Sequence, residues 1–175
     1  FKILENKLAK HKSQENSLIF PTGYMTNLGV ITSLVKKNDL ILSDEKNHAS
    51  LIEACKMSDA KISIFMHNNM DDLESKIKTK AKRKFIITEG VFSMDGDFSN
   101  LKRISEISEK NNAITILDDA HGDFILGNDG KGTADHFDVS KKIDVYTSSL
   151  SKGLGSFGGY VSSKKNVVDL CINKS

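Results

Sequence analysis

The sequence predicts an α/β fold with a mostly parallel central sheet flanked by helices. Short apolar runs alternate with amphipathic helical segments along the whole chain, which is the pattern of βα units. Continuous apolar runs of this kind are typical of strands that are buried on both faces. The chain has 175 residues, of which 38% are hydrophobic, and this length is typical of one domain with one sizeable core.

Strands are predicted from apolar runs that end in polar or glycine residues. They are residues 40–42, 62–65, 85–88, 114–117, 145–147 and 159–161. Helices are predicted where apolar side chains recur at intervals of three and four. They are the amphipathic opening segment around Leu8, and residues 25–35, 48–57, 70–78, 101–110 and 166–172. Asn100 is the predicted cap of one helix, and Pro21 marks a strand-to-helix turn.

Charge and composition narrow the possible partners. The formal net charge is +2, from 25 basic and 23 acidic residues, and this excess does not predict binding to nucleic acid or to a membrane. No apolar run is long enough to span a bilayer, and the first residues lack the pattern of a secretory signal. Cys55 and Cys171 lie far apart and outside any zinc-type spacing, which favours a reduced, cytoplasmic protein.

Polar residues directly after the predicted strands are the candidate site, because ligands of α/β sheets bind beyond the carboxyl ends of the strands. Lys152 follows the strand at 145–147, among serine and glycine residues. Such a backbone allows a ligand to approach closely, and a lysine amine that burial keeps partly neutral can attack an aldehyde. The alternative is a solvated lysine in a flexible loop.

Two histidines and an aspartate extend this candidate site. Asp118 follows the strand at 114–117, where a carboxylate can pair with a protonated ring nitrogen, and His121 can reach the same ligand. His48 begins a predicted helix, where its ring can stack on a flat aromatic ligand or serve only as a cap or surface residue. Asp118 and His121 can alternatively belong to a metal site, although no further ligands follow at a characteristic spacing.

Other polar groups suit a phosphate and a phenol oxygen. Gly23 and Tyr24 lie at a helix start, where free backbone amides bind anions, and Ser149 can add a hydroxyl. Ser93 follows the strand at 85–88 and suits a phenolic oxygen, unless it belongs to a plain polar turn. A phosphate, a phenol oxygen, a pyridine nitrogen and an aldehyde are together the groups of pyridoxal 5'-phosphate.

The order of these motifs resembles the α-oxoamine synthase family, whose members are pyridoxal-phosphate enzymes of fold type I. The motifs that carry the resemblance are Thr22-Gly23-Tyr24, Asn47-His48-Ala49-Ser50, Glu89-Gly90-Val91-Phe92-Ser93-Met94-Asp95-Gly96-Asp97, Asp118-Asp119-Ala120-His121-Gly122 and Ser149-Leu150-Ser151-Lys152. The resemblance implies that residues 1–175 are the large catalytic domain that binds pyridoxal phosphate. It also implies that they are a fragment of a longer chain, without the small C-terminal domain of the family.

The resemblance implies a role for each candidate residue. Lys152 would form the Schiff base with the cofactor, and Asp118 would pair with the pyridinium nitrogen. His48 would stack on the ring and meet the substrate. Ser93 and His121 would lie near the phenol oxygen. The backbone of Gly23 and Tyr24 and the hydroxyl of Ser149 would hold the phosphate. No residue is assigned to a metal.

The reaction implied is the condensation of an amino acid with an acyl-CoA thioester, with decarboxylation, in a homodimer. Residues 130–137 and 120–122 are most similar to members that use alanine and a pimeloyl thioester; glycine and acetyl-CoA are the alternative pair. Two other classes stay open from the residues alone. They are a metal-dependent hydrolase that uses His48, Asp118 and His121, and a non-catalytic fragment.

Overall fold

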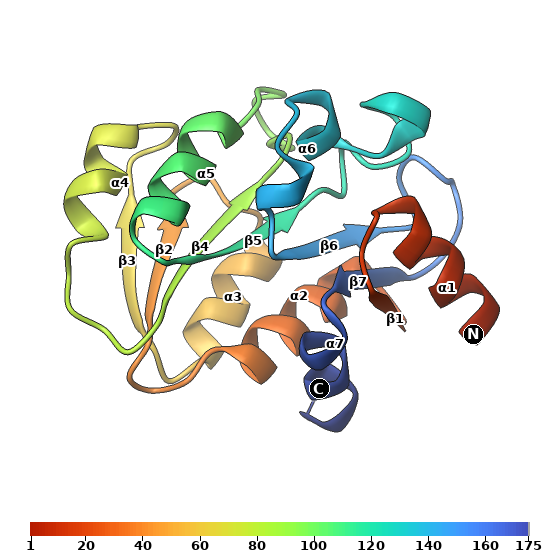
Figure 1. Cartoon of the computed structure of the whole chain (residues 1–175), viewed down its shortest axis with the longest axis horizontal. Helices are drawn as coiled ribbons and strands as arrows, with labels where there is room; N and C mark the ends of the chain where they lie inside the picture. The colour runs from red at the N-terminus through yellow and green to blue at the C-terminus, as the bar shows by residue number, and fades with distance from the viewer. Residues whose placement is uncertain (175) are drawn as a thin grey trace.

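The computed structural model describes residues 1–174 and is an α/β domain with a seven-stranded sheet between two layers of helices (Figure 1). The strands are β1 (Asn16–Phe20), β2 (Leu40–Asp44), β3 (Lys61–Phe65), β4 (Lys84–Glu89), β5 (Ile114–Asp118), β6 (Val145–Ser149) and β7 (Gly159–Ser163). The helices are α1 (Lys2–His11), α2 (Gly23–Leu34), α3 (Ala49–Met57), α4 (Met70–Lys76), α5 (Leu101–Lys110), α6 (Thr133–His136) and α7 (Lys165–Lys174). The predicted fold class is confirmed.

The order of strands across the sheet is β1-β7-β6-β5-β4-β2-β3. Strands β3, β2, β4, β5 and β6 run parallel to their neighbours, whereas β7 is antiparallel to β6 and β1 is antiparallel to β7. Parallel strands end at the same edge of a sheet, so the residues after β2, β4, β5 and β6 are brought together there.

Every strand predicted from the sequence is present, and each is longer than predicted by one or more residues. One strand, β1, is absent from the predicted ranges, although the strand-to-helix turn predicted at Pro21 implies a strand before it. It starts with the polar pair Asn16-Ser17, which shortens its apolar run, and it lies at the edge of the sheet beside β7. The single-turn helix α6 was also not predicted, because four residues are too few to show a helical period.

The core has two layers, one on each face of the sheet, and the strands alternate between them. On β2, Ile41 packs in the layer that contains α2, α3 and Cys171 of α7. Its neighbours Leu40 and Leu42 pack on the other face, with α4 and α5 (Figure 1). Full burial of one such side chain contributes roughly 1.5–3 kcal/mol to the stability of the fold. The two apolar layers therefore stabilise the sheet from both faces and fix where its strands end.

Two smaller predictions about the helices are also settled. Asn100 caps α5, since its side chain accepts a hydrogen bond from the backbone N–H of Arg103 at 3.3 Å. Cys55 and Cys171 are buried in α3 and α7 respectively. Within residues 1–174, none of the helices has both the length and the apolar character needed to cross a membrane.

Candidate functional site

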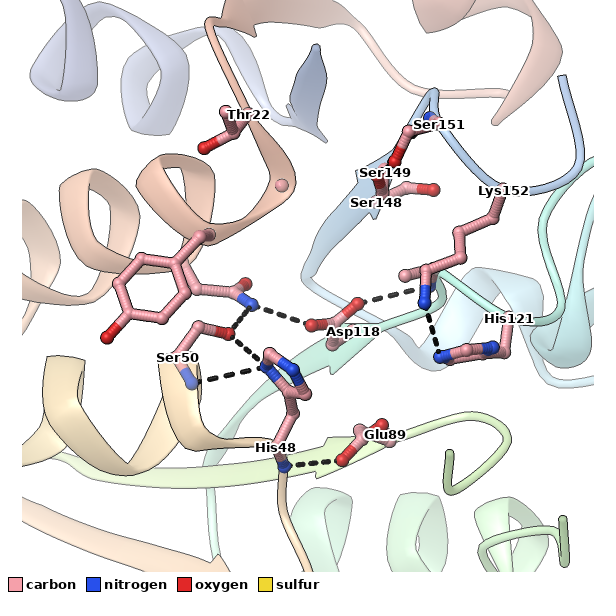
Figure 2. A pocket seen from close by; sticks show the side chains of 14 residues that line it. Thr22, His48, Ser50, Glu89, Asp118, His121, Ser148, Ser149, Ser151 and Lys152 are labelled. Carbon is pink, nitrogen blue, oxygen red and sulfur yellow. Dashed lines mark hydrogen bonds between the residues drawn. The ribbon is translucent and has the colours of Figure 1, made fainter. Parts of the chain in front are cut away.

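A pocket opens at the carboxyl edge of the sheet, where the start of α2 and the ends of β4, β5 and β6 meet the loop before α3 (Figure 2). Its lining includes most of the residues selected from the sequence, which are Gly23, Tyr24, His48, Asp118, His121, Ser149 and Lys152. The strand ends and the helix start therefore deliver these side chains to one place, although they are spread through most of the chain.

Asp118, the last residue of β5, lies at the centre of this group and is buried. Its Oδ2 accepts a hydrogen bond from the Asn27 side chain at 2.6 Å, and its Oδ1 accepts from the backbone N–H of Ala120 at 3.0 Å. Within the described residues 1–174, Asp118 forms no salt bridge. Burial therefore dominates and raises the pKa of this carboxyl above its ordinary value.

A chain of hydrogen bonds leads from Asp118 to His48. The Asn27 amide that donates to Asp118 also donates to Ser50 Oγ at 2.9 Å, and Ser50 Oγ lies 2.8 Å from Nδ1 of His48. The backbone N–H of Ser50 donates to the same Nδ1 at 3.2 Å. Because Nδ1 accepts this bond, a neutral His48 ring carries its proton on Nε2, and its orientation is coupled to that of Asp118.

Glu89, the last residue of β4, is a buried carboxyl that also lines the pocket. Its Oε1 accepts a hydrogen bond from the backbone N–H of His48 at 2.5 Å, and the backbone of Ser93 donates to the same carboxyl. Burial first, and then the charge of Asp118, raise the pKa of Glu89 to about 8. Glu89 thus holds a proton near neutral pH and joins the loop before His48 to the loop after β4.

Lys152 lies on the opposite side of the pocket, in the exposed turn after β6. Its Nζ is 3.1 Å from Nε2 of His121, which follows β5. Partial burial, and then the charges of Lys152 and His48, lower the pKa of His121. His121 is therefore neutral at neutral pH, and its Nε2 can accept a hydrogen bond from the lysine amine.

The start of α2 supplies backbone donors. Thr22 caps this helix: its Oγ1 accepts from Met25 N at 3.1 Å, and its carbonyl accepts from Thr26 N at 3.0 Å. The amides of Gly23 and Tyr24 precede these bonds, at the positive end of the helix dipole. Ser149 lies close by, since a Cβ on Gly23 would come within 2.9 Å of its Cβ. These groups suit a phosphate.

Gly159 on β7 is what allows α2 to start so close to the sheet. A Cβ on this residue would lie 2.6 Å from Cα of Gly23 and 2.7 Å from its backbone nitrogen. We expect Gly159→Ala to push the helix start away and to lower the free energy of unfolding by about 1–3 kcal/mol. Urea denaturation measures this loss, and Gly159→Val should lose more; an unchanged midpoint for both variants would contradict the close packing.

Ser93 is the one selected residue that does not line the pocket. It lies exposed in the loop after β4, where its backbone rather than its hydroxyl faces Glu89. Its contact with a phenol oxygen stays a prediction. The structure adds Thr22, Asn27, Ser50 and Glu89 to the lining.

Two of these added residues, Asn27 and Glu89, could have been noticed in the sequence as polar residues in otherwise apolar positions. Asn27 lies one turn before Val30 and Ile31 on the core side of α2, and a polar residue in that row is unusual. Glu89 ends an otherwise apolar strand. In the part of the chain that the structure describes, no group of three or more histidine, cysteine or acidic side chains is arranged to hold a metal ion.

The chain is related to a known protein family. The family model described as aminotransferase class I and II matches residues 2–174. The chain therefore belongs to the aminotransferase class I and II family.

Particular relatives are named 8-amino-7-oxononanoate synthase. The protein of Thermoanaerobacter pseudethanolicus is 47% identical over 169 residues, which is 95% of this chain and 43% of the relative. That of Treponema denticola is 45% identical over 174 residues, which is 98% of this chain and 44% of the relative. The chain thus spans less than half the length of these curated relatives.

Solved structures of similar fold match nearly the whole chain. The serine palmitoyltransferase of Sphingomonas wittichii superposes with a TM-score of 0.91 at 33% identity, over 95% of this chain and 42% of that one. A structure of SPT with PLP has a TM-score of 0.91 at 31% identity, over 96% and 43% of the two chains. An 8-amino-7-oxononanoate synthase from Francisella tularensis has a TM-score of 0.87 at 29% identity, over 98% and 50%.

Proposed function

We propose that this chain is the pyridoxal-phosphate-binding large domain of a longer enzyme, with the cofactor in the pocket at the carboxyl edge of the sheet. The observation that carries the proposal is the placement of the buried Asp118 between an exposed lysine, Lys152, and a helix start with free amides. A cation on a ring nitrogen would compensate the buried carboxylate, which explains why such a group can be kept there. The SPT structure with PLP supports this assignment.

The residues present fit the group. Within residues 1–174, the buried Oδ1 of Asn27 has no hydrogen-bond partner, and it belongs to a side chain of the pocket lining. Buried polar atoms without partners are costly, so a polar ligand would stabilise this position. The absent side chains at Gly23 and Gly159 leave the space in which Ser149 and the α2 amides approach one another.

Each side chain then has a defined task. The amides of Gly23 and Tyr24 and the hydroxyl of Ser149 would bind the phosphate. His48, oriented through Ser50, would stack on the ring, and Asp118 would hold the proton of the ring nitrogen.

Lys152 and His121 would serve in the removal of a proton from the substrate. Pyridoxal phosphate supplies an aldehyde that bonds amines and a ring that withdraws electrons. Lys152 would bond that aldehyde at rest, and its Nζ, once free, would take the α-proton of the amino acid. His121 would accept a hydrogen bond from the amine and keep it pointed at the pocket.

The reaction that we propose joins an amino acid to an acyl-CoA thioester, with release of CoA and carbon dioxide. Relatives at 42–47% identity that are named 8-amino-7-oxononanoate synthase favour alanine and a pimeloyl thioester, which is a step of biotin biosynthesis. Release of CoA from pimeloyl-CoA and acetyl-CoA, with alanine or glycine, tests this choice in the full-length protein. Faster turnover of glycine with acetyl-CoA would favour a glycine C-acetyltransferase instead.

Replacement of Asp118 by asparagine tests the site. The variant keeps the shape of the side chain but loses the charge that would hold the ring-nitrogen proton. We expect turnover to fall by about 100- to 1,000-fold and cofactor affinity to weaken, as measured by CoA release and by absorbance titration. Asp129→Asn, at an exposed position, is the control. Wild-type turnover in Asp118→Asn would contradict the assigned role.

We also propose that the full protein is a cytoplasmic homodimer. Apolar side chains are exposed in two segments that also carry pocket residues: Tyr24 at 44% and Met25 at 48% at the start of α2, and Phe157 at 77% in the loop that contains Lys152. Exposed apolar side chains of this kind favour coverage by a second protein surface. Sedimentation of the full-length protein as an active monomer would contradict the dimer.

A further inference from the structure

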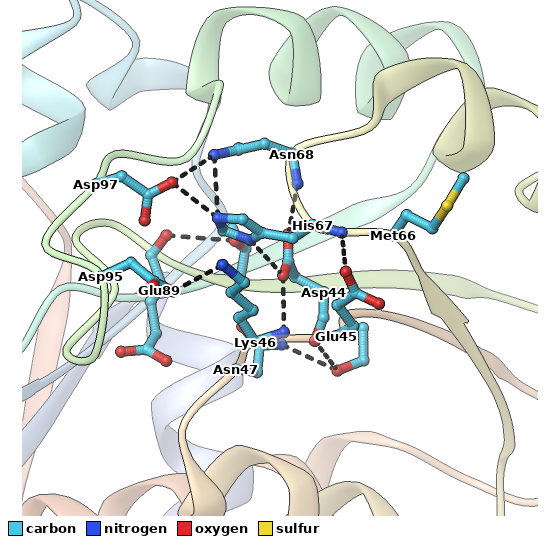
Figure 3. Close-up of polar contacts among 12 residues, drawn as sticks. Asp44, Glu45, Lys46, Asn47, Met66, His67, Asn68, Glu89, Asp95 and Asp97 are labelled. Carbon is cyan, nitrogen blue, oxygen red and sulfur yellow. Dashed lines mark hydrogen bonds and ion pairs between the residues drawn. The ribbon is translucent and has the colours of Figure 1, made fainter.

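His67 lies outside the pocket, in the turn between β3 and α4, and its ring is held between two carboxylates (Figure 3). Nδ1 is 2.8 Å from Asp44 Oδ1, and Nε2 is 2.8 Å from Asp97 Oδ2. Phe92 packs edge-on against the ring, with 4.4 Å between ring centroids. Nε2 also lies 3.4 Å from the Asn68 amide nitrogen, but the ring donates to both carboxylates at once only when it is an imidazolium.

Charged groups from four segments lie around His67: β2, the loop after β2, the loop after β4, and α4. Asp44 ends β2, and Glu45 in the next position accepts a hydrogen bond from the His67 backbone N–H at 2.9 Å. Asp97 lies in the loop after β4, where Asp95 pairs with Lys46. From α4, Asp72 binds the backbone N–H of Met66 at 2.8 Å. Burial lowers the pKa of His67, but the bonds to Asp44 and Asp97 outweigh it, and the pKa is raised above 6.5.

The two carboxylates adjoin the two loops that carry candidate cofactor contacts. Asp44, the last residue of β2, directly precedes the loop that leads to His48, and Asp97 lies in the loop that contains Ser93. The same loops meet again inside the pocket, where Glu89 binds the backbones of both His48 and Ser93. Glu89 thus joins these loops inside the pocket. His67, its neighbour Asn68, which donates to both Asp44 and Asp97, and the exposed Lys46–Asp95 pair join them outside it.

Accordingly, we propose that His67 is a positioning residue which, as a cation, ties these two loops together and so holds His48 in place against the ligand. The proposal rests on the proposed cofactor site, because His48 is expected to stack on the cofactor. His67 itself touches no residue of the pocket lining through its side chain in residues 1–174; it acts through Asp44 and Asp97.

The sign of the pH dependence follows from the raised pKa. The cross-link is complete while the ring is protonated, below pH 6.5, and is lost as the pH rises through the folded-state pKa of His67. Other groups near the site also titrate, above all Glu89 with its pKa of about 8. The difference between wild type and a His67 variant isolates the contribution of His67.

The test uses the full-length protein with His67→Gln, which donates one hydrogen bond and does not titrate. Absorbance titration with pyridoxal phosphate at about pH 6 should show a dissociation constant raised about 10- to 100-fold, as for a displaced binding group. The two dissociation constants should converge as the pH rises through the folded-state pKa of His67 and the wild-type ring loses its proton. Without cofactor, amide hydrogen exchange in residues 44–48 and 90–99 should be faster in the variant.

Two further variants keep the test decisive if His67→Gln does not fold. Asp97→Asn removes the charge at one end of the cross-link and should change the same quantities in the same direction. Asp95→Asn is the matched control, because it breaks the exposed Lys46–Asp95 pair between the same loops, and exposed pairs contribute little. Its dissociation constant should stay within about twofold of wild type.

The outcomes separate this proposal from the cofactor site itself. A His67→Gln protein that melts earlier, yet keeps wild-type affinity, pH profile and loop exchange, would overturn the positioning role. Equal effects of Asp95→Asn and Asp97→Asn would overturn it too, since general charge loss would then explain both. If wild type binds no pyridoxal phosphate, the proposed function fails, and the exchange of the two loops alone decides whether His67 ties them.

Discussion

Replacement of Lys152 by alanine in the full-length protein is expected to lower turnover by at least about 1,000-fold, because the variant has no amine to take the substrate proton. The phosphate contacts at the start of α2 do not involve this side chain, so pyridoxal phosphate should still bind, without a covalent link. Borohydride reduction followed by peptide mass spectrometry should therefore label wild type at Lys152 and leave the variant unlabelled. CoA release measures the loss of turnover.

Two control variants show whether the loss of turnover is due to the missing amine, to the missing positive charge, or to the removal of any lysine. Lys152→Arg keeps a positive charge but cannot act as a nucleophile, and it should lose as much turnover as the alanine variant. Lys164→Ala, at an exposed position, should keep wild-type turnover. Reductive labelling of another lysine in wild type would refute the role of Lys152.

Replacement of Lys12 by methionine is expected to lower the stability of the fold, and this is the second large effect. The Lys12 side chain is 1% exposed, and its Nζ lies 2.9 Å from Asp119 Oδ2 and 2.8 Å from Asp123 Oδ1. It also donates to the Lys131 carbonyl at 2.8 Å. Burial lowers the pKa of Lys12, but the two carboxylates outweigh it and raise the pKa, so the amine is charged. The variant leaves the buried Asp119 without its cation and Asp123 with the His11 ring at 3.2 Å, and it should lose about 3–5 kcal/mol of unfolding free energy.

The pH dependence of this loss gives a second check. Burial already raises the pKa of Asp119, and without Lys12 this carboxyl should take up a proton still more readily in the folded state than in the unfolded one. Groups with a raised folded-state pKa stabilise at low pH, so the deficit should be smaller near about pH 5 than near about pH 8 in urea denaturation. Lys10→Met, at an exposed position of α1, is the control. Equal stability of the two variants would contradict the buried network.

The part of the candidate site that lies at strand ends could be predicted from the sequence. Lys152, Asp118 and His121 come at or just after the ends of predicted strands. Because parallel strands end at the same edge of a sheet, their proximity could be predicted without knowledge of the side-chain positions. Asn27 was missed because its position belongs to the core face of α2, where periodicity predicts an apolar residue. The roles of all these residues remain predictions until the variants are measured.

Contacts between distant segments could not be predicted. Lys12 reads as the exposed end of an amphipathic helix, and its partner Asp119 lies 107 residues further along the chain. The same holds for His67: one of its carboxylates, Asp44, ends a strand that precedes it in the sequence, and the other, Asp97, lies in a loop that follows it. Such networks depend on the order of strands across the sheet, and local patterns carry no information on that order.

The position of β1 has a consequence for synthesis of the chain. Its hydrogen-bonding partner is β7, and the buried pair Ser17 and Ser162 lies 145 residues apart in the sequence. A ribosome therefore releases β1 long before its partner strand β7 has been made, while β2 to β5 can already associate. Until then its apolar residues Leu18, Ile19 and Phe20 stay unpaired, and a chaperone that shields them would raise the yield of folded protein.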